Sequence, residues 1–275
     1  MALSMNTNPT SLNAQRNLGN AQMHLSQNLA KLSSGLRINQ AADDAAGLGI
    51  SEKMRAQVRG LAQASRNAND GVSMIQVAEG AMNEQAGILT RLRELAVQSA
   101  NGTLGATERG FISTESTEAI AELDRISAVT DFNGVKMLGA NAGVQTMQVG
   151  TSSSANDRID ITFAQTDSAT LLAGGTIDLS SAAASRTSLD AIDTAISTLS
   201  TSRASVGASQ NRLVVTMNNL SVAKENIAAS ESRIRDVDVA EETAAMPRNQ
   251  ILSQAGVSVL AQANQLPSAA LKLLG

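Results

Sequence analysis

Two stretches of the chain carry an apolar residue at every seventh position. In an α-helix such a strict repeat forms one narrow stripe, which is the seam of a coiled coil. The seam positions are Met54, Leu61, Ala68, Ile75, Met82, Leu89 and Ala96 in the first stretch and Ile192, Leu199, Val206, Leu213, Leu220, Ile227 and Ile234 in the second. We predict two long helices that pair antiparallel, since each would otherwise expose its seam to water.

The first long helix is predicted from about residue 44 to about residue 100, although Gly60, Gly71, Gly80 and Gly87 fall inside it. Each glycine costs roughly 1 kcal/mol relative to alanine in a helix interior. Because the seam keeps its phase across all four, we interpret them as points of close packing rather than breaks. Asn101-Gly102 is expected to end the helix in the left-handed conformation.

Polar residues interrupt the second seam at Arg203, Gln210, Lys224 and Glu231. Long charged side chains are rarely buried without partners. We expect the first three to lie at the edge of the seam, where they face water or another subunit.

Between the seams, Thr107 is expected to cap a helix that ends near residue 130, and Phe132-Asn133-Gly134 reads as a turn. The apolar residues Val144, Met147 and Val149 precede a polar loop, and after it Ile159, Ile161 and Phe163 alternate with polar residues. This period of two predicts a β-hairpin. Residues 176–179 are expected to add a short strand.

The two ends are predicted as amphipathic helices over about 12–36 and 241–274. Pro247 fits near the start of the second helix or at a kink, and Pro267 is expected to limit it. Their stripes include Leu18, Leu25, Leu29 and Leu32, and then Leu252, Val259 and Leu266. Two thin helices cannot bury both stripes against each other, so we expect other subunits to cover them.

The fold predicted from these patterns is mainly α: an elongated antiparallel helical rod, like a coiled-coil bundle, with a small β-hairpin lobe and with both termini paired at one end. Residues 1–42 and 237–275 are assigned to the paired terminal helices. Residues 43–185 and 186–236 are assigned to the two halves of the rod.

Composition supports thin helical layers rather than a thick core. The 275 residues include three Phe and no Trp, Tyr or Cys, and the formal net charge is −4. Interspersed charges offer no basic face, so nucleic acid is not an expected partner. The chain shows no uninterrupted apolar span and no signal-peptide pattern at its start, so neither membrane insertion nor Sec export is expected.

Catalytic chemistry has little support in the sequence. The single His24 has no nearby carboxylate partner, Asp43-Asp44 and Glu241-Glu242 suit helix starts, and Gly47-Leu48-Gly49 lacks the preceding strand of a phosphate loop. No catalytic residue, metal or cofactor is predicted, and the protein is not expected to be an enzyme.

Several long motifs resemble those of bacterial flagellins. Near the start these are residues 32–39, 43–48, 64–71 and 91–102, and near the end 210–213, 231–234, 249–252 and 260–265. The resemblance covers roughly residues 1–140 and 185–275. The middle is about forty-five residues, so the large outer domains of longer flagellins should be absent. Pro247 stands where the family usually has Ser or Thr.

The resemblance implies a structural subunit that polymerises into the flagellar filament, with its terminal helices lining an inner tube and its rod forming an outer tube. It implies secretion through the flagellar type III apparatus, with an export chaperone, a cap protein and hook–filament junction proteins as partners. In this family the terminal segments fold on polymerisation. Whether the filament is naked, sheathed or periplasmic stays open.

The resemblance also implies a stretch that the animal toll-like receptor for flagellin recognises in many members. Leu89, Arg91 and Leu95 match contact positions, with Glu115 on the next helix. Leu89 also lies on the seam, which favours a packing role. Alternatives to the filament subunit are a flagellin-like hook–filament junction protein and, from a different class, a secreted coiled-coil or membrane-active effector.

Overall fold

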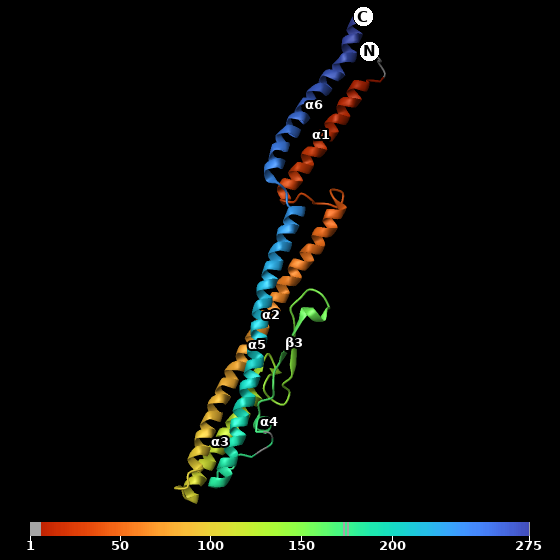
Figure 1. Cartoon of the computed structure of the whole chain (residues 1–275). Helices are drawn as coiled ribbons and strands as arrows, with labels where there is room; N and C mark the ends of the chain where they lie inside the picture. Colours follow the sequence, from red (N-terminus) through yellow and green to blue (C-terminus); the bar gives the residue numbers. More distant parts are fainter. Residues whose placement is uncertain (1–6, 173, 175, 275) are drawn as a thin grey trace. The chain divides into compact units, whose positions relative to one another are not determined.

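The computed structural model describes residues 7–172, 174 and 176–274, with side chains through residue 265, and it is built mostly of helices (Figure 1). The chain forms two compact units. One combines the residues up to 58 with those from 226 onward, and the other spans residues 59–225. The long helices α2 (Ala45–Ser99) and α5 (Ala182–Arg235) contribute to both units.

The seam residues form the centre of the second unit. From Leu61 to Ala96 on α2 and from Ile192 to Leu220 on α5, every seventh residue is buried. Most of them join a single apolar cluster, which also contains residues of α3 (Ala106–Val129) and of the β-hairpin. Met54, Ile227 and Ile234 belong to the other unit and are partly buried. The two predicted long helices are thus confirmed. α2 begins and ends within one residue of the prediction, whereas α5 begins four residues before the predicted residue 186 and ends one residue before 236.

The four glycines of α2 do not share one explanation. A Cβ on Gly60 would come within 2.8 Å of Thr151 Cγ2, and one on Gly71 would lie 3.2 Å from both Leu213 Cδ1 and Met147 Cγ. The close-packing interpretation holds at these two positions. It is wrong for Gly80 and Gly87, where a Cβ would meet nothing within 4 Å because both positions open to solvent.

This contrast gives a stability prediction. Replacing Gly80 with Ala should raise the free energy of unfolding by about 0.5–1 kcal/mol, because alanine restricts the unfolded chain and the folded position has room. Gly71→Ala is the matched control and should give no gain or a loss, since its methyl group would press on Leu213 and Met147. Urea unfolding followed by circular dichroism measures both. Equal gains at the two sites would contradict the packing difference.

The end of α2 differs from the sequence prediction. Neither Asn101 nor Gly102 adopts a positive φ among the described residues, so the expected left-handed cap is wrong. The guanidinium of Arg109 instead donates to the Ser99 carbonyl at 3.1 Å and to the Asn101 carbonyl at 2.9 Å. An arginine from the next helix therefore satisfies the free carbonyl groups that a glycine cap usually serves.

The third helix, α3 (Ala106–Val129), leads into a tight hairpin formed by β1 (Asp131–Phe132) and β2 (Val135–Lys136). The turn residues Asn133 and Gly134 have φ of 51° and 81°, as a type I′ turn requires. The N-cap of α3 is Gly105, which has no side chain to cap with, so the predicted capping role of Thr107 is wrong.

The predicted β-hairpin is confirmed. β3 (Val144–Gln148) pairs antiparallel with β4 (Arg158–Thr162), with Met147 opposite Ile159. A short 3-10 turn, Ala155–Asp157, precedes β4, and the short helix α4 (Ser168–Leu171) follows it. The expected strand at 176–179 is wrong. That segment is irregular, with Leu179 buried and its carbonyl accepting from Ser99 Oγ at 2.7 Å.

In the first unit, α1 (Pro9–Ser34) lies beside α6 (Val239–Leu274) (Figure 1). Asn8 caps α1 by accepting from Ser11 N, and Gly35 ends it with φ of 72°. Asp238 caps α6. The predicted limit at Pro267 is wrong, because α6 continues through both prolines. A proline removes one helical hydrogen bond, but its fixed φ near −65° is itself helical.

Candidate functional site

The seam between α1 and α6 is made of small residues. On α1 the buried side chains are Ser11, Ala14, Ala21 and Asn28, and on α6 Ala263 is buried. A Cβ on Gly256 would lie 3.2 Å from Leu18 Cδ1. Small side chains let the two helix backbones approach closely, so the seam is narrow and buries little apolar area.

Polar contacts fix the register of this narrow seam. Ser11 Oγ donates to Asn264 Oδ1 at 2.8 Å, and Asn8 Nδ2 donates to the Ala263 carbonyl at 2.7 Å. Near the other end of α1, Asn28 lies within hydrogen-bond distance of Glu242 Oε1 (3.0 Å) and Asn249 Nδ2 (3.1 Å). Because buried polar groups need specific partners, these contacts favour one alignment of α1 against α6.

Several larger apolar side chains of the terminal helices are exposed rather than buried in this seam. On α6, Leu252 is 50% exposed and Val259 is 53% exposed, and Leu29 on α1 is 51% exposed. Among the side chains that the structure describes, the exposed large apolar residues of the two helices are Leu12, Met23, Leu29, Val239, Ile251, Leu252, Val257 and Val259. We call these residues the outward apolar set.

The residues predicted for packing between subunits therefore fall into three groups. Leu29, Leu252 and Val259 are exposed, whereas Leu18, Leu25 and Leu32 are partly buried. The side chain of Leu266 lies outside the described residues. The sequence prediction missed the small-residue seam, although Ala14, Ala21 and Asn28 are themselves seven residues apart.

In the first unit, hydrogen bonds join the segment between α1 and α2 to the segment between α5 and α6, and an ion pair lies beside them. The Arg37 amide donates to the Arg235 carbonyl at 2.7 Å, and the Val237 amide donates to the Gly35 carbonyl at 3.1 Å. Leu36 and Asp236 form an isolated antiparallel bridge, and the Arg235 side chain, only 12% exposed, pairs with Glu52. We call this set of contacts the clasp. It joins the α1–α2 connection to the α5–α6 connection.

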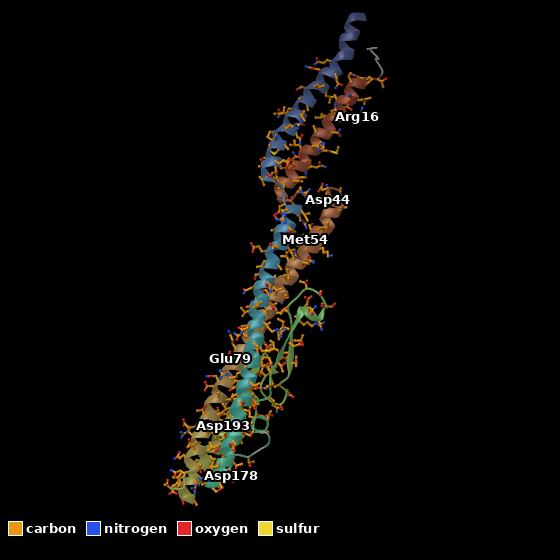
Figure 2. The ribbon with its side chains drawn as sticks, in the orientation of Figure 1. Arg16, Asp44, Met54, Glu79, Asp178 and Asp193 are labelled. Atoms are coloured by element: carbon orange, nitrogen blue, oxygen red, sulfur yellow. The ribbon has the colours of Figure 1, made fainter. Side chains whose placement is uncertain are left out.

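Asp43 and Asp44, the acidic pair before α2, accept hydrogen bonds from different backbone amides. Asp44, labelled in Figure 2, accepts from the Gly47 amide at 2.8 Å and so caps α2. Asp43 instead accepts from the amides of Gln40 and Asn39, each at 3.0 Å. These hydrogen bonds, with Gln40 contributing most, lower the pKa of the Asp43 carboxyl below its ordinary value. Both carboxyl groups thus hold the backbone just before and at the start of α2.

The residues matched to receptor recognition do not form one accessible patch. Leu89 and Leu95 are buried in the core of the second unit. Arg91 is exposed and donates to Glu115 Oε1 from Nε at 2.9 Å and from Nη2 at 2.7 Å, and it also pairs with Glu94. Hydrogen bonding to Glu115 is the main cause that raises the pKa of Arg91 above its ordinary value.

Other charged groups lie on the surface of the second unit. Arg93 donates from Nε to Asp193 Oδ1 at 2.7 Å, which links α2 to α5, and Figure 2 labels Asp193. Arg203 and Gln210 are partly buried and Lys224 is exposed, so none of the three is enclosed in the seam. His24 is exposed on α1.

No group of three or more metal-ligating side chains occurs among the described residues. Within the same part of the chain, no helix is both long enough and apolar enough to cross a bilayer.

The paired terminal helices, the long antiparallel helices and the short hairpin match known proteins along nearly the whole chain. Residues 5–143 match the bacterial flagellin N-terminal helical region, and residues 189–274 match the bacterial flagellin C-terminal helical region. The chain belongs to the bacterial flagellin family.

Relatives of similar length agree with this assignment. A flagellin of Halalkalibacterium halodurans is 46% identical over 98% of this chain and 99% of its own length. The flagellar filament 33 kDa core protein of Treponema phagedenis is 43% identical over the same shares of the two chains. This flagellin and these two relatives thus match over nearly the full length of each chain.

Solved structures agree on the fold. The crystal structure of Bacillus cereus flagellin is 30% identical, with a TM-score of 0.51, and the match covers 60% of this chain and 94% of that one. A putative flagellar hook-associated protein from Vibrio parahaemolyticus has a TM-score of 0.60 at 15% identity, covering 70% of this chain and 100% of that one. The second likeness concerns the fold alone.

Proposed function

We propose that this flagellin is a structural subunit that polymerises into the bacterial flagellar filament, the propeller used for motility. The observation that carries the proposal is the outward apolar set. Leu252, Val259 and Leu29 expose about half of their side-chain surface on helices that already have each other as partners. Burying one Leu or Val side chain stabilises an assembly by about 1.5–3 kcal/mol, so contacts between copies would be favourable.

The mechanism follows from the two kinds of seam. The small-residue seam joins α1 to α6 within one chain, and this leaves the outward apolar set for neighbouring subunits. The α2–α5 core with its ion pairs supplies a stiff helical unit to each subunit. The function is therefore mechanical: lateral and axial packing of helical subunits builds a tube that transmits torque.

The family assignment supports further proposals on export and partners. The subunit is secreted through the flagellar type III apparatus, with an export chaperone that holds the C-terminal segment and with cap and hook–filament junction proteins at the filament ends. For the animal toll-like receptor, the exposed Arg91–Glu115 pair is the accessible part of the candidate surface. Leu89 and Leu95 act as core residues in the folded subunit.

Electron microscopy of the purified chain tests the proposal. The unmodified protein should grow long tubes, whereas Leu252→Ser combined with Val259→Ser should raise the critical concentration for polymerisation about tenfold or more, since each lost apolar contact weakens association. Replacing the exposed Val97, which lies on α2 outside the outward apolar set, with Ser is the matched control.

The same preparation separates the alternatives. A hook–filament junction protein shares the fold but adds only a short segment, so failure to grow long tubes would contradict the filament proposal. A membrane-active effector would bind liposomes and would not polymerise. Liposome co-sedimentation performed beside microscopy therefore distinguishes all three functions.

A further inference from the structure

Phe111 on α3 is 72% exposed, while the other aromatic side chains of the chain, Phe132 and Phe163, are partly buried or buried. A single exposed apolar residue is ordinary on a protein surface. The surroundings of Phe111 are not ordinary. Glu108, Glu115 and Glu118 lie three before, four after and seven after it, so all four side chains share one face of the helix. We call this face the acidic ridge.

A groove elsewhere in the same unit has complementary chemistry. Its volume is about 560 Å³, and it lies between the β-hairpin and α5. Val149 and Ile159 are apolar and buried, and Val215 is apolar and exposed. Arg158 and Arg212 contribute guanidinium groups. The remaining lining residues are Asn156, Asp157, Asn211 and Thr216. We call this the basic groove.

The positive charges of the basic groove are available to a partner. Arg212 makes no hydrogen bond or ion pair with any described residue, and Arg158 has one long contact, from Nη2 to the Ser153 carbonyl at 3.4 Å. The one carboxylate in the groove, Asp157, is engaged by the Ser152 amide at 2.8 Å. The groove thus offers one free guanidinium group, that of Arg212, and a second that is held by a single long contact, that of Arg158, beside an apolar surface.

The ridge has the opposite character. Glu118 has no ion pair among the described residues, while Glu115 is held by Arg91. An aromatic anchor surrounded by carboxylates fits a pocket that has apolar walls and arginines at its edge, because aromatic anchors dominate binding energy and complementary charges fix register.

The two surfaces lie far apart on one subunit. Beside the groove, Asn67 on α2 donates from Nδ2 to the Gln148 carbonyl at 3.0 Å, whereas beside the ridge Arg91 on α2 pairs with Glu115. At 1.5 Å per residue, the length of α2 between these two positions gives a separation of roughly 36 Å. The ridge therefore cannot fill the groove of its own chain.

We propose that the acidic ridge of one subunit docks into the basic groove of a second copy of this chain. Phe111 enters the groove beside Val215, and Glu118 pairs with Arg212 or Arg158. The contact joins two different surfaces, so it is heterologous, and such contacts propagate into open filaments when the rotation does not close. The proposal rests on the proposed function, because it names one of the contacts by which the subunit polymerises.

Disulfide cross-linking tests this contact directly, because the chain contains no cysteine of its own. A chain carrying both Phe111→Cys and Val215→Cys should give a ladder of covalent oligomers under mild oxidation. The matched control carries Val129→Cys with Val215→Cys, since Val129 is also exposed on α3 but lies outside the ridge. Equal ladders from both pairs, or no ladder from the first, would overturn the proposal.

Charge reversal provides a second readout that does not depend on cysteines. Arg212→Glu should raise the critical concentration for polymerisation about tenfold, as expected for losing one partner of a close charge pair. Adding Glu118→Arg should restore most of the loss. Single variants that polymerise like the unmodified chain, or a double variant worse than either, would contradict the pairing. Far-ultraviolet circular dichroism should be unchanged throughout, because both side chains are exposed.

The outcomes separate the two proposals. Long tubes of unmodified protein without the specific ladder would remove the ridge–groove contact and leave the filament function standing. A ladder from the Phe111→Cys and Val215→Cys pair without long tubes would support the ridge–groove contact and contradict the filament function.

Discussion

A chain that lacks residues 241–275 is expected to remain a soluble, partly helical monomer and to form no filament at any concentration. The deletion removes nearly all of α6, including Ile251, Leu252, Val257 and Val259 of the outward apolar set. It also leaves the buried residues of α1 without cover. Both the intersubunit surface and the folded state of α1 are lost together, so the expected effect is complete.

Sedimentation and electron microscopy measure this result, and circular dichroism shows whether the helices of the 59–225 unit persist. That unit has its own apolar cluster, so most of its helical signal should remain. The full-length chain with Leu252→Ser and Val259→Ser separates the two losses, because it keeps the α1–α6 seam. Filaments grown from the truncated chain would contradict the proposal that residues 241–275 are needed for polymerisation.

Leu89→Ala is expected to have the largest effect of any single substitution considered, a loss of about 2–5 kcal/mol in the free energy of unfolding. Leu89 is fully buried in the apolar cluster, and removing its branched end leaves a cavity that a tightly packed seam cannot close. Urea unfolding of the full chain gives the value. Val97→Ala, at a half-exposed position on the same helix, should change stability little.

The same variants decide how Leu89 should be interpreted in receptor recognition. If it acts through the core, receptor signalling by the Leu89 variant should fall in step with its unfolding. Arg91→Ala should weaken signalling without a matching loss of stability, because its ion pairs are exposed. A Leu89→Ala chain as stable as the unmodified protein would contradict the core assignment.

The sequence was sufficient for the long helices because the seven-residue repeat continues for more than forty residues in each. No local irregularity at Gly80 or Gly87 could shift so long a pattern. The same reasoning failed for short-range features. Asn101-Gly102 has the residues of a left-handed cap, but Arg109 reaches the same carbonyl groups from another helix, and that contact has no local signal.

In the terminal helices, the hydrophobic pattern did not predict the residues that form the α1–α6 seam. Leu252 and Val259 stand out by their size, and the pattern predicts them as a stripe that packs against other subunits. The pattern does not predict the face that meets α1, which is marked by small residues such as Gly256 and Ala263, also seven apart. Hydrophobicity alone favours the large side chains, whereas close approach of two backbones selects the small ones. The groove beside Arg212 also had no sequence signal, because the hairpin and α5 meet only in the fold.

The clasp has a consequence for the order in which the chain can fold. Leu36 meets Asp236 across a separation of 200 residues, and α1 has its partner helix at the opposite end of the chain. Contacts between such distant segments form late, because the closure entropy of a long loop must be overcome first. Under the export proposed above, a subunit threaded end first through a narrow passage could not pair α1 with α6 before its last residues emerge. Completion of the terminal unit would then coincide with arrival at the end of that passage.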